Sequence, residues 1–255
     1  MISAASSNEE ILVVLHRVAD AVAVVLGANT NWSLSGKKPT QYSVDLDCDN
    51  VALAILRNEG FAVLSEESVR TGEWGVGDIL VVIDPLDGST NASRGIPWYS
   101  TALCAVDHHG LRASLVVNQA SGRDRYWATL GGGAFHNGRK IGHSGCTQLR
   151  EAIVGISGLP KQRPGWSQFR ANGGAALDIC LVAEGATDGW VDFNSHGVWD
   201  YLASLLICIE AGVAVAEHND CELLVTEHGE RRTPVIAATT ELLVALREIR
   251  NAHAR

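Results

Sequence analysis

The sequence predicts an α/β (α+β) protein built from two successive units. Apolar runs of strand length, rich in valine and isoleucine, indicate buried strands at residues 79–83, 152–156 and 189–193. Longer segments between and after the later runs have helical spacing of apolar residues. Between the two groups, short strands separated by turns fill residues 101–129. Alternating strands and helices on either side of a meander predict layers of sheet and helix.

The N-terminal part begins with a helix at residues 11–26. His16, Arg17 and Asp20 interrupt its apolar run, so we interpret it as an amphipathic helix and not as a membrane anchor. A polar loop at residues 36–42 follows. A second helix at 49–58 and a short strand at 61–64 come next.

The meander is expected to contain strands at residues 101–106, 111–118 and 125–129. His108 and His109 stand beside a glycine between the first two strands. We interpret them as solvated residues of a hairpin turn, because adjacent histidines at a turn glycine are seldom metal ligands.

Beyond residue 145 the pattern alternates again. The expected order is a strand at 152–156, a helix at 175–184, a strand at 189–193, a helix at 199–211, strands near 213 and 235, and a last helix at 241–252. We therefore predict an N-terminal α+β domain at residues 1–140 and a C-terminal α/β domain at residues 141–255.

Composition restricts the function classes. The 255 residues are 46% hydrophobic, which is ample for a packed core. The 29 acidic and 20 basic residues give a net charge of −9, which argues against nucleic acid as a partner and fits an acidic cation-binding cleft. The six cysteines show no Cys-x-x-Cys spacing, so we expect a reduced, cytoplasmic protein.

The most informative segment follows the strand at 79–83. Pro85 cannot continue a central ladder, so the chain is expected to leave the sheet at Asp84. Asp87 can then fold back beside Asp84, and the two carboxylates would offer hard oxygen ligands to a divalent cation. The backbone amides that come next could accept a phosphate; they belong to Gly88, Ser89 and Thr90.

Two further acids stand at comparable places. The strand ending at Leu64 runs into Ser-Glu-Glu, which would bring Glu66 beside Asp84 if the two strands end at one sheet edge. Asp200 precedes an apolar helix, and taken alone it would be interpreted as an N-terminal cap.

Together, Ser-Glu-Glu at 65–67, Asp-Pro-Leu-Asp-Gly-Ser-Thr-Asn at 84–91 and Trp-Asp at 199–200 resemble the inositol monophosphatase family of metal-dependent, lithium-sensitive phosphatases. Segments 131–138 and 173–178 also look like family segments, so the resemblance covers most of the chain. It implies a layered α-β-α-β-α sandwich of the sugar-phosphatase type, with the metal and phosphate site in the N-terminal domain and the C-terminal domain completing that site and the substrate pocket.

Carried over by position, the resemblance implies that two or three Mg²⁺ ions are held by Glu66, Asp84, the carbonyl of Leu86, Asp87 and Asp200. Ser89 stands where the family has a threonine that orients the attacking water. The resemblance implies that the amides of Gly88 and Ser89 bind the phosphate, and we hypothesise that Glu67 helps to orient the attacking water.

The family has an early Thr-x-x-Asp motif whose acid helps to activate the water. Residues 43–49 offer Asp45, Asp47 and Asp49, and Asp49 is the preferred choice because it starts the expected helix that leads to Glu66. Leu46 then takes the threonine position.

For the substrate, the resemblance points to Asp192, one carbon shorter than the usual glutamate, and the loop at residues 194–197 is about one residue longer than in the family. His196 could contact the substrate or cap this loop, and the cap is slightly favoured. The loop at residues 158–169 would complete the pocket.

The expected activity is Mg²⁺-dependent hydrolysis of a small phosphorylated polyol or metabolite, by in-line attack of a metal-activated water. Inositol phosphates, histidinol phosphate, sugar bisphosphates and 3′-phosphoadenosine 5′-phosphate remain open as substrates. A phosphatase that forms an aspartyl phosphate would need Asp-x-Asp, which the spacing of Asp84 and Asp87 excludes. A non-catalytic metal- or phosphate-binding protein is the rival from another class. No nucleic acid or membrane partner is expected, and the resemblance implies a homodimer.

Overall fold

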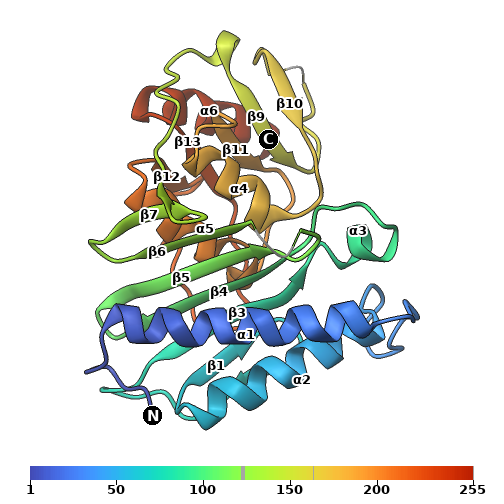
Figure 1. Ribbon diagram of the computed structural model, residues 1–255. Helices are drawn as coiled ribbons and strands as arrows, with labels where there is room; N and C mark the ends of the chain where they lie inside the picture. The colour runs from blue at the N-terminus through green and yellow to red at the C-terminus, as the bar shows by residue number, and fades with distance from the viewer. Residues whose placement is uncertain (122–123, 163, 255) are drawn as a thin grey trace.

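The computed structural model describes residues 1–121, 124–162 and 164–254, and the chain forms five layers (Figure 1). Helices α1 (Asn8–Ala28) and α2 (Ser43–Asn58) cover the outer face of a first sheet. Helices α4 (Ala175–Ala183) and α5 (Val198–Glu210) lie between that sheet and a second one. Helix α6 (Thr240–Ala254) covers the far face of the second sheet. The predicted α-β-α-β-α layering is therefore confirmed.

The first sheet has eight strands in the order β2-β1-β3-β4-β5-β6-β7-β8 within the described residues. Strands β1 and β3 are parallel, whereas the remaining pairs are antiparallel. The strands are β1 (Ala62–Ser65), β2 (Val69–Thr71), β3 (Leu80–Asp87), β4 (Ser100–Asp107), β5 (Gly110–Asn118), β6 (Arg125–Thr129), β7 (Gly133–His136) and β8 (Arg139–Lys140).

The second sheet has five strands in the order β10-β9-β11-β13-β12 within the same described ranges. Strands β9 and β11 are parallel, as β1 and β3 are in the first sheet. The strands are β9 (Ile153–Ser157), β10 (Gln168–Arg170), β11 (Gly189–Asp192), β12 (Ala214–Glu217) and β13 (Pro234–Ala237). The shorter elements are α3 (Ser89–Ser93) and a 3-10 turn at Leu149–Glu151.

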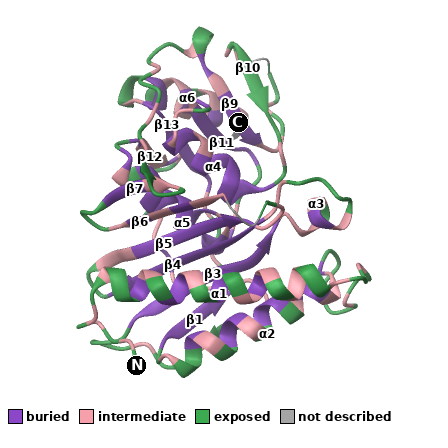
Figure 2. Cartoon of the chain, in the orientation of Figure 1, coloured by how far each residue is buried: buried purple, intermediate pink, exposed green. Residues whose placement is uncertain are grey.

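One of the three hydrophobic clusters in the described residues joins the two halves. It joins residues of β1 and β3, such as Leu64 and Val82, to residues of α4 and α5, such as Leu177 and Leu206. Figure 2 shows α4 and α5 almost wholly buried, whereas α1 and α2 expose their outer sides. Division into two domains stays a proposal, because α5 packs on both sheets.

Helix α1 is longer at both ends than the expected 11–26, because Ser7 and Glu10 form a reciprocal capping box at its start. By length and composition it could cross a membrane, with a mean hydropathy of 2.0 over 18 residues. In the fold, one stripe is buried, including Ile11, Leu15 and Val18. Such a stripe is typical of an amphipathic surface helix.

Helix α2 begins at Ser43, six positions before the expected start at Asp49. The carboxylate of Asp45 accepts a hydrogen bond of 2.7 Å from the backbone N–H of Tyr42, which satisfies a free donor at the start of the helix. Asp45 therefore lies in the first turn, and Asp49 lies one turn further along.

The expectation that the chain leaves the sheet at Asp84 is wrong. Strand β3 continues to Asp87, with an irregularity in its pairing to β4 between Asp84 and Asp87. The hydroxyl of Thr101 donates to the carbonyl of Pro85 at 2.9 Å, so this stretch stays attached to β4. The irregularity accommodates a proline that cannot donate to a regular ladder.

The hairpin at His108 and His109 forms as expected. Strand β4 ends at Asp107, β5 begins at Gly110, and both histidines are exposed.

Close packing between the second sheet and α6 can be tested at Gly189. A Cβ atom there would lie 2.5 Å from the side chain of Leu246 and 3.0 Å from the carbonyl oxygen of Ile236. We expect Gly189→Ala to lower the free energy of unfolding in urea by about 1–3 kcal/mol. Gly27→Ala in α1 is the control, because its Cβ would meet nothing within 4 Å. It should be neutral or stabilising by up to about 1 kcal/mol. Equal urea midpoints for the two variants would contradict this packing.

Candidate functional site

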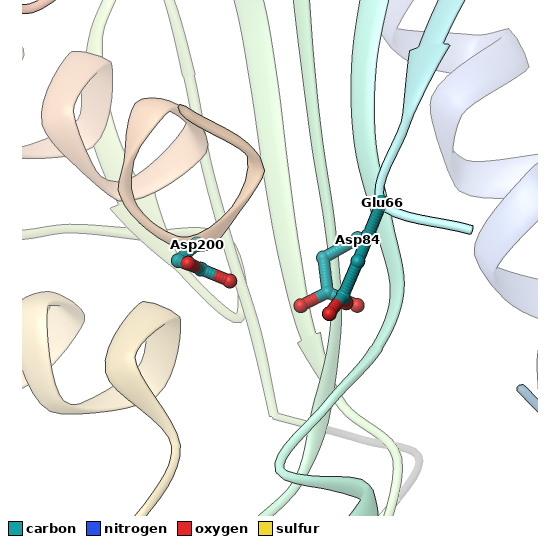
Figure 3. Close-up of side chains that lie close together, drawn as sticks. All are labelled: Glu66, Asp84 and Asp200. Carbon is teal, nitrogen blue, oxygen red and sulfur yellow. The ribbon is translucent and has the colours of Figure 1, made fainter. Parts of the chain in front are cut away.

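Three acidic side chains from distant parts of the chain converge at one end of the first sheet. The parallel pairing of β1 and β3 sets Ser65 opposite Ile83, so the residues that follow, Glu66 and Asp84, lie side by side. Asp200 approaches from the first turn of α5. One carboxylate oxygen from each of the three lies within 4.8 Å of the others. Figure 3 shows Asp200 facing the other two carboxylates from its helix.

Asp87 lies beside this cluster at the end of β3. One of its oxygens accepts hydrogen bonds from the backbone N–H of Ala176, at 3.0 Å, and from the hydroxyl of Ser100, at 3.4 Å. Asp87 and Asp200 both line a cavity of about 270 Å³. The carboxylate of Asp84 accepts from the N–H of Leu86 at 2.9 Å, which fixes the turn that carries the Leu86 carbonyl.

Asp200 stabilises the start of α5 and also faces the other two acids. It is the third residue of α5 and not the N-cap residue, which is Gly197. Its carboxylate nevertheless accepts a hydrogen bond of 2.9 Å from the N–H of Gly197, and so stabilises the start of the helix. The same carboxylate faces Glu66 and Asp84.

Burial and mutual repulsion disfavour the charged forms of these acids. Burial, followed by the charges of Asp200 and Glu67, raises the pKa of Glu66 to about 8. Burial and the charge of Asp200 raise the pKa of Asp87 to about 7, and burial raises the pKa of Asp200 to about 6. The pKa of Asp84 is raised well above its usual value by burial and by the charges of Glu66 and Asp87.

The donor set fits a hard divalent cation such as Mg²⁺. Mg²⁺ prefers carboxylate and carbonyl oxygens and keeps positions for water and phosphate. A cation would also remove the electrostatic cost that raises these pKa values. Within the described ranges, Glu66, Asp84 and Asp200 form the one group of acidic side chains that lie close enough together to hold an ion.

A second cavity, of about 190 Å³, lies beside the cluster on its Glu66 side. It is lined by Lys38, Thr40, Gln41, Asp45, Glu66, Glu67, Gly88, Ser89, Thr90 and Gly173. The residues expected at the phosphate, 88–90, are thus brought together with Glu66 and Glu67.

Gly88 is required by the turn that leads into α3. Its φ is +79°, and a Cβ atom would lie 3.0 Å from the carbonyl oxygen of Trp98 and 3.3 Å from that of Gly173. A glycine here lets the chain reverse while the backbone stays close to both units.

The three candidate acids of the early motif lie in different surroundings. Asp45 lines the cavity with Glu67 and Ser89, and its Oδ1 is buried without a hydrogen-bond partner. Asp49 instead accepts a hydrogen bond of 2.6 Å from the hydroxyl of Ser65 and does not line that cavity. Asp47 is exposed. Burial raises the pKa of Asp45 to about 7. The geometry therefore favours Asp45 over Asp49.

Glu67 is held by two residues from the polar loop before α2. The side-chain amide of Gln41 donates to its carboxylate, and the ammonium of Lys38 lies 3.3 Å from the same oxygen. Lys38 also donates to the backbone carbonyl of Glu66 at 2.8 Å. The sequence pattern marked this stretch only as a loop, and nothing in its spacing pointed to these contacts.

Asp178 lines the 270 Å³ cavity from the first turn of α4, although no sequence pattern indicated it as a site residue. It accepts hydrogen bonds from the indole N–H of Trp98 at 2.8 Å and from the amide of Asn172 at 2.7 Å. From sequence alone, an acid so close to the start of a helix is interpreted as a local cap, and Trp98, one of its two partners, is distant in the chain.

The residues expected at the substrate differ in whether they line the 270 Å³ cavity. His196 lines the 270 Å³ cavity, whereas Asp192 is completely buried behind it and does not line that cavity. The two side chains contact each other, since Nδ1 of His196 lies 2.7 Å from Oδ2 of Asp192. Part of the loop 158–169 lines a separate cavity; its residue 163 lies outside the described residues.

Comparisons with known proteins agree with this geometry. Residues 14–252 match the inositol monophosphatase family. A fructose-1,6-bisphosphatase/inositol-1-monophosphatase of Archaeoglobus fulgidus is 36% identical over 186 residues, which cover 70% of this chain and 70% of the relative. A putative Nus factor SuhB of Neisseria meningitidis is 33% identical over 186 residues, covering 68% of this chain and 69% of the relative.

A solved structure has the same fold. The IMPase of Thermotoga maritima superposes with a TM-score of 0.82 at 21% identity, covering 96% of this chain and 98% of that one. At this identity the likeness concerns the fold alone.

The raised pKa values predict an unusual pH dependence of stability in the absence of divalent cations. The folded chain keeps protons on Glu66, Asp87 and Asp200 at pH values where the unfolded chain has released them. Stability should therefore fall as the pH rises from about 5 to about 8. Adding Mg²⁺ at pH 8 should restore it, because a bound cation favours the charged carboxylates. Thermal unfolding with EDTA and with Mg²⁺ measures both effects.

Asp84→Asn is the matched variant for this experiment, because it removes one of the repelling charges. It should show a shallower pH slope and little or no gain in melting temperature from Mg²⁺. An identical slope and an identical Mg²⁺ effect in this variant would show that the cluster is not the source.

Proposed function

The chain belongs to the inositol monophosphatase family, and we propose that it is a divalent-cation-dependent phosphatase that hydrolyses small phosphate monoesters. The observation that carries the proposal is the convergence of the Glu66, Asp84 and Asp200 carboxylates beside a cavity that Gly88, Ser89 and Thr90 also line. Acids that hold cations next to donors that hold phosphate are what phosphate ester hydrolysis requires.

Mg²⁺ is the proposed cofactor, and two groups of ligands could hold it. Glu66, Asp84 and Asp200 form the first group, and the carbonyl of Leu86 lies in the turn beside Asp84. Asp87 and Asp200 face the neighbouring cavity and form the second. When bound, the ions would neutralise charge on the phosphoryl oxygens and lower the pKa of water at the site.

The proposed phosphate site is the turn at residues 88–90. Gly88 precedes the first turn of α3, and residues 88–90 line the cavity together with Glu66. Backbone amides in this arrangement bind phosphate oxygens without a desolvation cost for a charged side chain. The ammonium of Lys38 lines the same cavity and adds positive charge.

Ser89, Glu67 and Asp45 are the proposed groups that orient the attacking water. All three line the 190 Å³ cavity. Asp45 has an unpartnered buried oxygen that can accept a proton from a water hydrogen-bonded to it. Its pKa of about 7 lies near neutral pH, where a general base is most effective. Gln41 and Lys38 keep Glu67 in place.

The leaving group would occupy the 270 Å³ cavity. This cavity shares Gly173 with the phosphate cavity and carries Asp87 and Asp200 in its wall. A phosphate ester lying across the acids would therefore place its phosphoryl group at residues 88–90 and its alcohol near His196. The volume suits a small polyol or metabolite.

A non-catalytic role is the alternative, because four relatives are named Nus factor SuhB or putative Nus factor SuhB. The complete set of acids and the phosphate turn favour an enzyme. Phosphate-release assays with and without Mg²⁺, on inositol 1-phosphate, histidinol phosphate, fructose 1,6-bisphosphate and 3′-phosphoadenosine 5′-phosphate, distinguish the two.

We also propose a homodimer, which sedimentation would test.

Removing Asp87 tests the cation-dependent activity. Asp87→Ala should reduce Mg²⁺-dependent phosphate release by about 1,000-fold or more, because several kcal/mol of transition-state stabilisation would be lost. Its circular dichroism spectrum should stay unchanged. The exposed residue Glu73 provides the control Glu73→Ala, with turnover near that of the wild type. Near-normal turnover in the Asp87 variant would refute the assignment.

Three variants of α2 identify the acid of the early motif. We expect Asp45→Asn to lower kcat by about 100-fold or more, the usual contribution of a general base. Asp47→Asn should stay within about twofold, because Asp47 is exposed. Asp49→Asn should lower the melting temperature and have only a small effect on kcat, because Asp49 accepts a hydrogen bond from Ser65 and does not line the 190 Å³ cavity. A loss of kcat that follows Asp49 and spares Asp45 would return the role to Asp49.

A further inference from the structure

The loop between β11 and α5 contains a carboxylate–imidazole pair. Asp192 is completely buried, and its Oδ1 accepts hydrogen bonds from the backbone N–H groups of Asn194, at 2.8 Å, and Ser195, at 3.1 Å. Its Oδ2 is 2.7 Å from Nδ1 of His196. Both oxygens are therefore used within the loop, and the carboxylate is directed at His196 and not at the cavity.

The loop is held in a specific conformation. Ser195 has a φ of +129°, a value that residues with side chains rarely adopt, and the Asp192 carboxylate accepts from its N–H. His196 and Arg232 exchange backbone hydrogen bonds of 2.8 and 2.9 Å. A backbone outlier that surrounding contacts maintain is a common sign of a functional position.

His196 lines the 270 Å³ cavity, and its second ring nitrogen is Nε2. Nε2 lies 3.4 Å from the hydroxyl of Ser157, which also lines the cavity. Such a long contact leaves Nε2 available to a stronger acceptor. Among the described residues that line the cavity, His196 is the only basic side chain.

The environment favours the imidazolium form. A fully buried carboxylate such as that of Asp192 needs a positive partner, because an unpaired charge in the interior is costly. Burial lowers the pKa of His196, but the hydrogen bond to Asp192 and the nearby charges of Asp200, Asp192 and Asp87 outweigh it and raise the pKa to about 9. The hydrogen bond to Asp192 is the largest of the raising contributions, and it does not involve the proposed cation ligands.

We propose that His196 is the specificity-determining residue of the leaving-group cavity, where its Nε2–H binds a second negatively charged group of the substrate. The substrate class is then a small phosphate monoester that carries a further phosphate or carboxylate. Asp192 is a positioning residue, which acts through His196. This inference rests on the proposed function and names its substrate class.

The surroundings allow a substrate to extend in this direction. Ile156 lines both the 270 Å³ cavity and a larger one of about 680 Å³, which also carries the side chains of Lys161 and Arg170. The region beyond His196 is therefore roomy and contains positive charge. A neutral cyclitol would use neither feature.

Two substrates that differ in one terminal group, charged in one and neutral in the other, test the proposal. In 3-phosphoglycerate a carboxylate replaces the terminal alcohol of glycerol 3-phosphate. We expect His196→Gln to lower the ratio of their kcat/KM values, 3-phosphoglycerate over glycerol 3-phosphate, by about 10- to 100-fold. The change should lie mainly in KM. Fructose 1,6-bisphosphate and fructose 1-phosphate, used as a second pair, show whether a phosphate is preferred to a carboxylate.

The controls separate specificity from damage to the fold. His109→Gln makes the same change on the exposed hairpin and should leave the ratio unchanged. Inhibition by inorganic phosphate should be equal in the wild type and His196→Gln, because phosphate binds at residues 88–90. Asp192→Asn should lower the ratio in the same direction without changing phosphate inhibition.

The outcomes are distinct. If the wild type hydrolyses these esters and His196→Gln changes both members of a pair equally, or changes neither, the inference is overturned while the proposed function stands. If the wild type releases no phosphate from any of them with Mg²⁺, both are overturned.

Discussion

Repulsion between buried carboxylates is the constraint on which the rest of the site depends. Glu66, Asp84 and Asp200 bring oxygens within 4.8 Å of one another, and Asp87 lies beside them. Two like charges about 4 Å apart repel by about 4 kcal/mol at an effective dielectric constant of 20. The folded chain can offset such a cost by retaining protons or by binding cations. Only the second solution leaves the carboxylates charged at neutral pH.

The fold imposes this arrangement through elements from both halves of the chain. Parallel pairing of β1 and β3 places Glu66 beside Asp84. Asp87 follows the irregularity in the pairing of β3 with β4. Asp200 lies in the first turn of helix α5, which is packed between the two sheets. The acids therefore meet only when the second half docks on the first. The same docking places the leaving-group cavity between the acids and the loop that carries His196.

Much of this was predictable from sequence, because apolar periodicity and terminating acids are local signals. The strands before Glu66 and Asp84 and the helix that carries Asp200 lie where the pattern placed them. The signal failed at contacts that apolar periodicity does not encode. The hydroxyl of Thr101 keeps Pro85 beside β4, and the N–H of Tyr42 draws Asp45 into the first turn of α2. The pairing of Asp192 with His196 likewise depends on a loop conformation that no periodicity encodes.

The most direct test of the account is the location of cations in crystals of the protein. Crystals grown near pH 7.5 and soaked in Mn²⁺ would be measured at a wavelength where manganese scatters anomalously. We expect a peak within about 2.0–2.6 Å of oxygens from Glu66, Asp84 and Asp200, and a second peak that contacts Asp87. Anomalous density elsewhere on the surface, with this cluster empty at millimolar Mn²⁺, would contradict the claim that the acids are arranged to hold metal.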